Sequence, residues 1–227
     1  MVYLVVFLLL LAFIYLPQVW VQHVLARYNR KPESNFPGTG SELARHLLTR
    51  FGLDDVKVER TDTGDHYDPT ARCVRLTADK FDGKTLTAIT VAAHECGHAL
   101  QHAGAEPMFI LRSRLAASAI WAARLGSFLI FVAPMLALLS RAPSPAVLSV
   151  LGGFLVMGFG VLVQLITLPV ELDASFRKAL PVLEAGYLDQ RQIPAARRIL
   201  RAAAWTYVAA SLAGLLSFWR WLAILRR

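Results

Sequence analysis

Hydrophobic positions in this 227-residue chain form long apolar runs that alternate with two polar segments. The apolar runs cover residues 1–24, 115–139, 146–168 and 202–225. Each run is about 20 residues or longer, which as a helix matches the roughly 30 Å thickness of a bilayer's hydrocarbon core. The pattern therefore predicts a mainly α-helical membrane protein with about four transmembrane helices.

Charged residues are concentrated in the polar segments 25–114 and 169–201. These segments hold 19 of the 24 Lys and Arg residues and all 16 acidic residues. Since basic residues that flank membrane spans collect on the cytoplasmic side, we expect both segments to face the cytoplasm.

Composition narrows the class of protein further. Hydrophobic residues make up 56% of the chain, against about 45–50% in ordinary soluble domains, and the mean hydropathy is +0.46. This excess argues against a fully soluble enzyme and against a disordered or disulfide-built chain. The net charge of +8 comes without a basic run interleaved with aromatic residues, so no nucleic-acid partner is expected. Cys73 and Cys96 form no CxxC motif, and we expect reduced thiols.

Alternation and turn residues within 25–114 predict a small α+β domain. The expected elements are a helix capped by Ser41 that ends near Phe51, strands at 56–58 and 73–76 separated by a polar loop at 61–70, and a helix at 85–102 after a turn at 82–83. The last helix is the one that carries candidate chemistry.

This helix contains the motif HExxH, as His94-Glu-Cys-Gly-His98. Two histidines four residues apart lie on one helical face, so both imidazoles can bind one Zn²⁺. Glu95 is rotated away from that face and can reach a water on the metal, where it would act as the general base. Cys96 points away from the histidine face, which favours a small packing residue over a thiolate ligand.

A catalytic zinc site needs a third protein ligand beside an open position. His102 is eight residues beyond His94, roughly 12 Å along the helix, and is out of reach. The third metzincin histidine is also missing, because position 104 is Gly. The carboxylates that remain after the helix are Glu106, Glu171, Asp173, Glu184 and Asp189.

Among these carboxylates Glu171 stands out, because it directly follows the apolar run 146–168. Ser175 is four residues further on the same helical face and could hydrogen-bond a ligand. Asp173 points elsewhere and could pair with a basic residue or orient a ligand histidine.

Three stretches together resemble the YugP-type neutral zinc metallopeptidases of bacteria. They are Gly64–Pro69, Val91–His102 and Pro169–Ser175, and the likeness extends over most of the chain. The resemblance implies a membrane gluzincin, distantly similar to the HtpX and Ste24 membrane proteases, with His94, His98 and Glu171 as zinc ligands and Glu95 as base. It also implies a multi-pass protein of the bacterial inner membrane. Those proteases carry Asp four residues after the ligand Glu, where this chain has Ser175.

His66 and Tyr67 are candidates for a further catalytic role. In zincins an edge strand beside the active helix holds an extended substrate by backbone pairing, and the strand at 73–76 follows these two residues. His66 or Tyr67 could then donate a hydrogen bond to the oxyanion. The alternative is a polar turn shaped by Pro69.

The sequence thus predicts a zincin-like domain at the cytoplasmic membrane surface that cuts membrane-associated proteins or peptides. One rival is a non-proteolytic membrane scaffold with a structural zinc. Glu95 speaks against it, because a structural site has no use for a carboxylate beside its first ligand. Another rival is a zinc hydrolase that acts on a lipid or a small amide.

Overall fold

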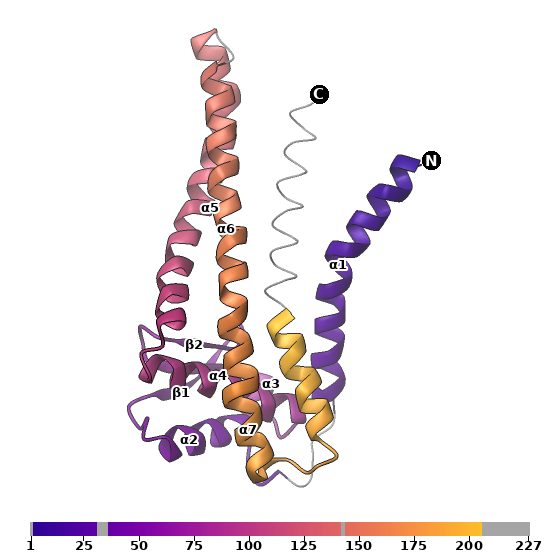
Figure 1. Cartoon of the computed structure of the whole chain (residues 1–227), viewed down its shortest axis with the longest axis vertical. Coiled ribbons are helices and arrows are strands. Elements are labelled where there is room, and N and C mark those ends of the chain that lie inside the picture. Colours follow the sequence, from indigo (N-terminus) through magenta and orange to yellow (C-terminus); the bar gives the residue numbers. More distant parts are fainter. Residues whose placement is uncertain (1, 31–35, 142–143, 206–227) are drawn as a thin grey trace. The chain divides into compact units, whose positions relative to one another are not determined.

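The structure is a computed structural model that describes residues 2–30, 36–141 and 144–205 (Figure 1). The chain divides into two compact units. Unit 1 comprises Met1–Leu16, Leu111–Thr167 and Tyr207–Arg227, and unit 2 comprises Pro17–Ile110 and Leu168–Thr206. Unit 2 therefore joins most of the two polar segments of the sequence.

Unit 1 takes its described residues from three long helices, α1 (Val2–Asn29), α5 (Pro107–Ser140) and α6 (Ser144–Asp173). The Ser149 hydroxyl of α6 donates to the backbone oxygen of Leu129 in α5 at 2.8 Å. A Cβ at Gly153 would lie only 3.0 Å from the backbone oxygen of Gly126 and closer still to the Ile130 side chain. Glycine at 153 therefore lets α6 approach α5 closely.

The membrane-spanning prediction is not supported. Among the helices formed by the described residues, none combines the length and the continuous apolar character needed to cross a bilayer. The expectation of about four transmembrane helices is therefore wrong for 1–24, 115–139 and 146–168, and the part of 202–225 beyond residue 205 lies outside the described residues. An apolar run is a statement about composition and does not by itself fix the helix that the segment forms.

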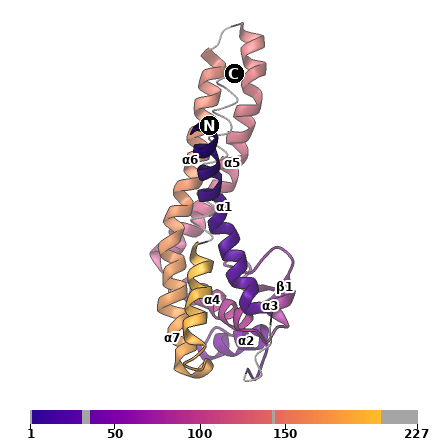
Figure 2. The ribbon, with the colours of Figure 1, turned by 90° about the vertical axis from the view of Figure 1, so that its right-hand side faces the viewer.

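Unit 2 contains helices and one small sheet. The helices are α2 (Gly40–Arg50), α3 (Ala78–Phe81), α4 (Leu86–Ala103) and the ends of α1, α5 and α6. Strands β1 (Lys57–Thr61), β2 (His66–Asp68) and β3 (Cys73–Thr77) form the sheet in the order β1-β3-β2. β1 runs parallel to β3, and β2 runs antiparallel to it. Figures 1 and 2 show α2 beside α4, which also contacts β2 and β3.

The chain after α6 stays helical but changes from α-helix to wider π-helical turns. The π-helix η1 (Ala174–Ala179), the short α7 (Leu180–Val182) and a second π-helix, η2 (Leu183–Tyr187), continue directly from Asp173. Residues 193–205 form a further helix. π-Segments are uncommon and often lie at functional sites.

The core of unit 2 surrounds α4, in which every residue from Leu86 to Ala99 is buried. Leu47 and Leu48 of α2, Val74 and Leu76 of β3, and Ile199 and Leu200 contribute to the same buried cluster. A helix buried on all sides holds its side chains rigidly, which suits a catalytic or metal-binding element.

Two local predictions need correction. The cap of α2 is Thr39 rather than Ser41, because Thr39 and Glu42 form a capping box in which Glu42 accepts from the Thr39 N–H at 2.7 Å. The predicted polar loop 61–70 contains β2, a strand too short to show a clear alternation. β3 is therefore central in the sheet, and β2 is an edge strand.

Candidate metal centre

Helix α4 presents His94 and His98 on one face. Its N-terminus is capped by Thr85, whose hydroxyl accepts from the Ala88 N–H at 3.1 Å. The two imidazole rings have centroids 4.7 Å apart and planes at 77° to each other. Both rings are buried, so the helix delivers two nitrogen ligands to one enclosed point.

Glu171 faces these two rings from the end of α6. Its Oε2 lies 3.2 Å from Nε2 of His94 and 3.2 Å from Nε2 of His98. The Glu171 side chain is only 1% exposed. One ligand atom from each residue falls within 4.8 Å of the others, and within the described parts of the chain this is the one such group of three or more His, Cys, Asp or Glu side chains.

The charge of Glu171 suits a metal ligand. Burial on its own would raise the pKa of this carboxyl, but His98 and His94 beside it hold the pKa well below its usual range. Glu171 is therefore ionised at neutral pH, as a carboxylate ligand must be.

Gln101 settles which nitrogen His98 can offer to a metal. The Gln101 amide NH₂ donates to the backbone oxygen of Val170 at 2.9 Å and to Asp173 at 2.9 Å. Both partners are acceptors, so the amide oxygen must be the atom that faces Nδ1 of His98, at 2.9 Å. The Nδ1–H of His98 then donates to Gln101, and Nε2 keeps its lone pair for a metal.

Ser175 contacts Nδ1 of His94, as Gln101 contacts Nδ1 of His98. Its hydroxyl oxygen lies 3.1 Å from Nδ1 of His94, and the serine is fully buried in η1. When the Ser175 hydroxyl accepts from Nδ1 of His94, the Nε2 lone pairs of both histidines and a carboxylate oxygen of Glu171 face one another. Such a set is favourable only around a cation or with added protons, and N,N,O ligation is typical of catalytic zinc sites.

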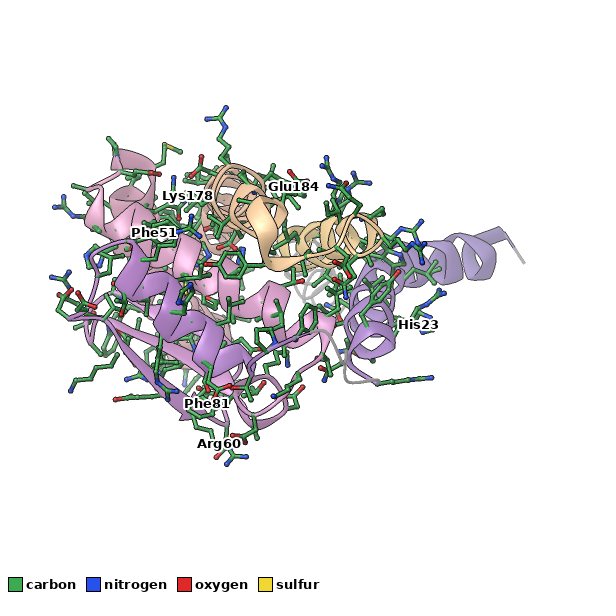
Figure 3. All side chains as sticks on the ribbon, turned by 90° about the horizontal axis from the view of Figure 1, so that it is seen from below. His23, Phe51, Arg60, Phe81, Lys178 and Glu184 are labelled. Atoms are coloured by element: carbon green, nitrogen blue, oxygen red, sulfur yellow. The ribbon has the colours of Figure 1, made fainter. Side chains whose placement is uncertain are left out.

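Asp173 supports the site without facing the ligands. Besides accepting from Gln101, it pairs with Lys178 at 2.9 Å, and Lys178 also pairs with Glu106 at 2.6 Å (Lys178 is labelled in Figure 3). Burial would raise the pKa of Asp173, but the hydrogen bonds from Lys178 and Gln101 lower it. Asp173 thus pairs with the basic residue Lys178 and reaches His98 through Gln101.

Close contact between α4 and η1 depends on a glycine inside the HExxH motif. A Cβ at Gly97 would lie 2.8 Å from the backbone oxygen of Ala174, closer than real Cβ atoms approach. Glycine therefore lets the histidine-bearing helix reach the segment that carries Glu171 and Ser175.

Glu95 is buried in α4, one position after His94. Cys96, the next residue, is also buried and packs with its Sγ 3.6 Å from the backbone oxygen of Ala44 in α2. The motif thus turns the cysteine toward the core.

His66 and Tyr67 point in opposite directions from β2, as successive strand residues do. The Tyr67 hydroxyl lies 2.8 Å from Nδ1 of His102, at the end of α4, and the ring packs against Phe109, which in turn packs against His98. Burial raises the pKa of Tyr67 to about 12, so the phenol stays protonated. Nδ1 of His66 instead lies 2.8 Å from the backbone oxygen of Gly64. The structure thus brings Tyr67, and not His66, toward α4.

The sequence did not indicate that Gln101 would hydrogen-bond His98 or that His102 would contact Tyr67. A glutamine carries no metal-ligand signature, and two of its three hydrogen bonds, to Val170 and Asp173, form only when α6 is in place. The usable signal was spacing, because Gln101 lies three residues after His98 on the same side of α4.

Comparison with known proteins points to a family whose name includes zinc. A family described as "Putative neutral zinc metallopeptidase" matches residues 2–226. A relative from Bacillus subtilis (strain 168), named "Putative membrane protease YugP", is 38% identical over 197 residues, which cover 86% of this chain and 84% of the relative. No solved structure matches the chain.

Proposed function

This chain belongs to the neutral zinc metallopeptidase family, and from that membership we propose that it is a zinc-dependent endopeptidase with His94, His98 and Glu171 as ligands. The convergence of these three buried side chains, with Glu95 directly after the first of them, is the observation that carries the proposal. The donor set of two imidazoles and one carboxylate suits zinc and leaves room for a fourth ligand.

The chemistry divides between the ion and the protein. A bound Zn²⁺ would polarise the scissile carbonyl and lower the pKa of a water to about 7. Glu95 accepts the proton of the attacking water as the new C–O bond forms, and returns it to the amide nitrogen as the C–N bond breaks. The products are one carboxylic acid and one amine, which exchange a proton to give a carboxylate and an ammonium group at neutral pH, and Glu95 ends in its starting state.

Residues around the ligands keep this geometry. Gln101 and Ser175 hold the two histidines through Nδ1, and Asp173 holds Gln101. Tyr67 is a protonated donor close to His102 and Phe109, and we assign it the stabilisation of the oxyanion. We assign no catalytic contact to His66.

Substrate binding is assigned to β2. It is an edge strand of the three-stranded sheet and contacts α4, so an extended peptide can pair with its outer side. The name of the Bacillus relative favours membrane-associated proteins or peptides as substrates at a membrane surface. Two buried free cysteines fit the reducing cytoplasm as the compartment of unit 2.

The experiment compares Glu95→Gln with the wild type and with Glu59→Gln, a matched change on the exposed strand β1. Each full-length protein is purified with zinc and incubated with a library of internally quenched peptides. We expect Glu95→Gln to retain about one zinc per chain and to lose hydrolysis by several orders of magnitude, while Glu59→Gln cleaves normally. Unchanged cleavage by Glu95→Gln would refute the mechanism.

A further inference from the structure

The helix formed by residues 193–205 has two unlike faces. Ala196, Ile199, Leu200, Ala202 and Ala204 are buried in unit 2. The residues of the other face are exposed, and they are Pro194, Arg197, Arg198, Arg201 and Trp205. We call this set the basic face.

A hollow of about 340 Å³ lies on the basic face. Its lining consists of Ile193, Pro194 and the three arginines. Arg197 donates to Glu184 at 3.0 Å, but both side chains are largely exposed, so this pair is weak. Arg198 and Arg201 have no ion pair within the described parts of the chain.

Three like charges within two helical turns repel one another, and one carboxylate offsets only one of them. An anion bound in the hollow would remove this repulsion. Guanidinium groups match phosphate oxygens in a two-pronged geometry, which makes phosphate the best fitting anion.

Trp205 indicates where the phosphate comes from. It lies one turn beyond Arg201 on the same face and is 46% exposed. An exposed tryptophan is unfavourable in water, but it is the residue most typical of the interface between lipid head groups and hydrocarbon. Arginines followed by tryptophan on one helical face are typical of helices that lie on a membrane surface.

We propose that the basic face binds the phosphate head groups of anionic lipids and holds unit 2 against a membrane surface. This proposal goes beyond the peptidase function and does not depend on zinc or on hydrolysis. Glu171 and the basic face belong to the same unit. If both the peptidase function and the lipid binding hold, the metal centre acts on substrates close to the bilayer.

The experiment measures sedimentation of the zinc-loaded full-length chain with vesicles. One vesicle type contains phosphatidylcholine alone, and the other contains one third phosphatidylglycerol. The ratio of the two affinities is compared, because apolar parts of the chain bind both vesicle types alike. The test variant is the double substitution Arg198→Gln and Arg201→Gln. We expect it to lower the preference for anionic vesicles about thirtyfold at low salt and not to change peptide cleavage.

The control is the double substitution Arg60→Gln and Arg72→Gln, which removes the same charge. Arg60 and Arg72 form exposed pairs with Asp82 and Asp55, and Figure 3 labels Arg60 on the side of unit 2 away from Glu184. The control should keep the preference for anionic vesicles. An equal loss in both double variants would show that net charge alone matters, and this would overturn the proposal.

Inorganic phosphate and Trp205→Ala separate a lipid from a free phosphate. At constant ionic strength, added phosphate should leave vesicle binding nearly unchanged, whereas Trp205→Ala should weaken it for both vesicle types. Full displacement by millimolar phosphate would identify a free phosphate-bearing ligand, and normal vesicle binding by Trp205→Ala would refute the membrane surface as partner.

Discussion

The amide oxygen of Gln101 lies 2.9 Å from Nδ1 of His98, and this contact decides which nitrogen of His98 can face a metal. The amide cannot be reversed, because its NH₂ group already donates to Val170 and Asp173. The buried Gln101 side chain therefore connects His98 of α4 with the backbone next to Glu171. Through Asp173 it also reaches the ion pairs of Lys178.

Removing the Gln101 amide should weaken metal binding and leave the ligands in place. Gln101→Leu keeps a similar volume but loses all three hydrogen bonds, so we expect zinc affinity to fall about 10–100-fold. Competition with a fluorescent chelator measures it. Gln192→Leu, at a glutamine whose amide oxygen accepts from the Asp189 N–H, is the control and should bind zinc normally. Equal affinity in the Gln101 variant would refute the positioning role.

Substitutions of Glu171 and of Ser175 should affect zinc binding differently. Glu171→Ala removes one of three ligands, and we expect zinc and activity to be lost together. Ser175→Ala removes only a partner of His94, so it should retain zinc with affinity reduced about 10–100-fold. Metal analysis of the purified proteins distinguishes the two. Full zinc occupancy in Glu171→Ala would show that another residue is the third ligand.

Gly97 should be intolerant of a side chain. In Gly97→Ala the new methyl group would meet the backbone oxygen of Ala174, forcing α4 and η1 apart at a cost of about 1–3 kcal/mol. We expect a lower thermal midpoint and weaker zinc binding. Gly158→Ala, where a Cβ meets no atom within 4 Å, is the matched control and should not lower the midpoint. A Gly97→Ala protein as stable as wild type would contradict the close approach.

Both cysteines should resist thiol reagents in the folded protein. Burial raises the pKa of Cys73 to about 11, and burial with the nearby charge of Glu95 raises that of Cys96 further, so neither forms much thiolate at pH 8. Titration with a coloured disulfide reagent should detect no reactive thiol before denaturation and two afterwards. Rapid labelling of native protein would show that one of them is accessible.

Local patterns accounted for the histidine-bearing helix and failed at the cap and the edge strand. The helix was expected at 85–102 and spans Leu86–Ala103, because its pattern and its capping threonine act within a few residues. Thr39 replaced Ser41 as the cap of α2, since the choice depends on which hydroxyl meets the free N–H groups of the first turn. β2 was hidden in a polar loop because three residues gain strand geometry only from pairing with β3.

The membrane spans show a different limit. The apolar excess is real, but it describes the composition of the chain alone. Whether a helix meets the length and apolar character of a bilayer crossing depends on where the helix begins and ends, and none of the described helices meets both.

By itself, the sequence determined that His94 and His98 share one helical face with Glu95 next to them. Residues four positions apart lie one above the other in any α-helix, whatever the rest of the fold is. The sequence narrowed the third ligand to a few carboxylates and could not choose among them by spacing. Tertiary structure alone brought Glu171 against both Nε2 atoms, paired Glu184 with Arg197, and turned Asp173 toward Gln101. For Glu171 and Asp173 the physical reason is distance along the chain: contacts between residues about 70 positions apart are decided by the packing of α4 against α6 and η1, for which Gly97 leaves the space.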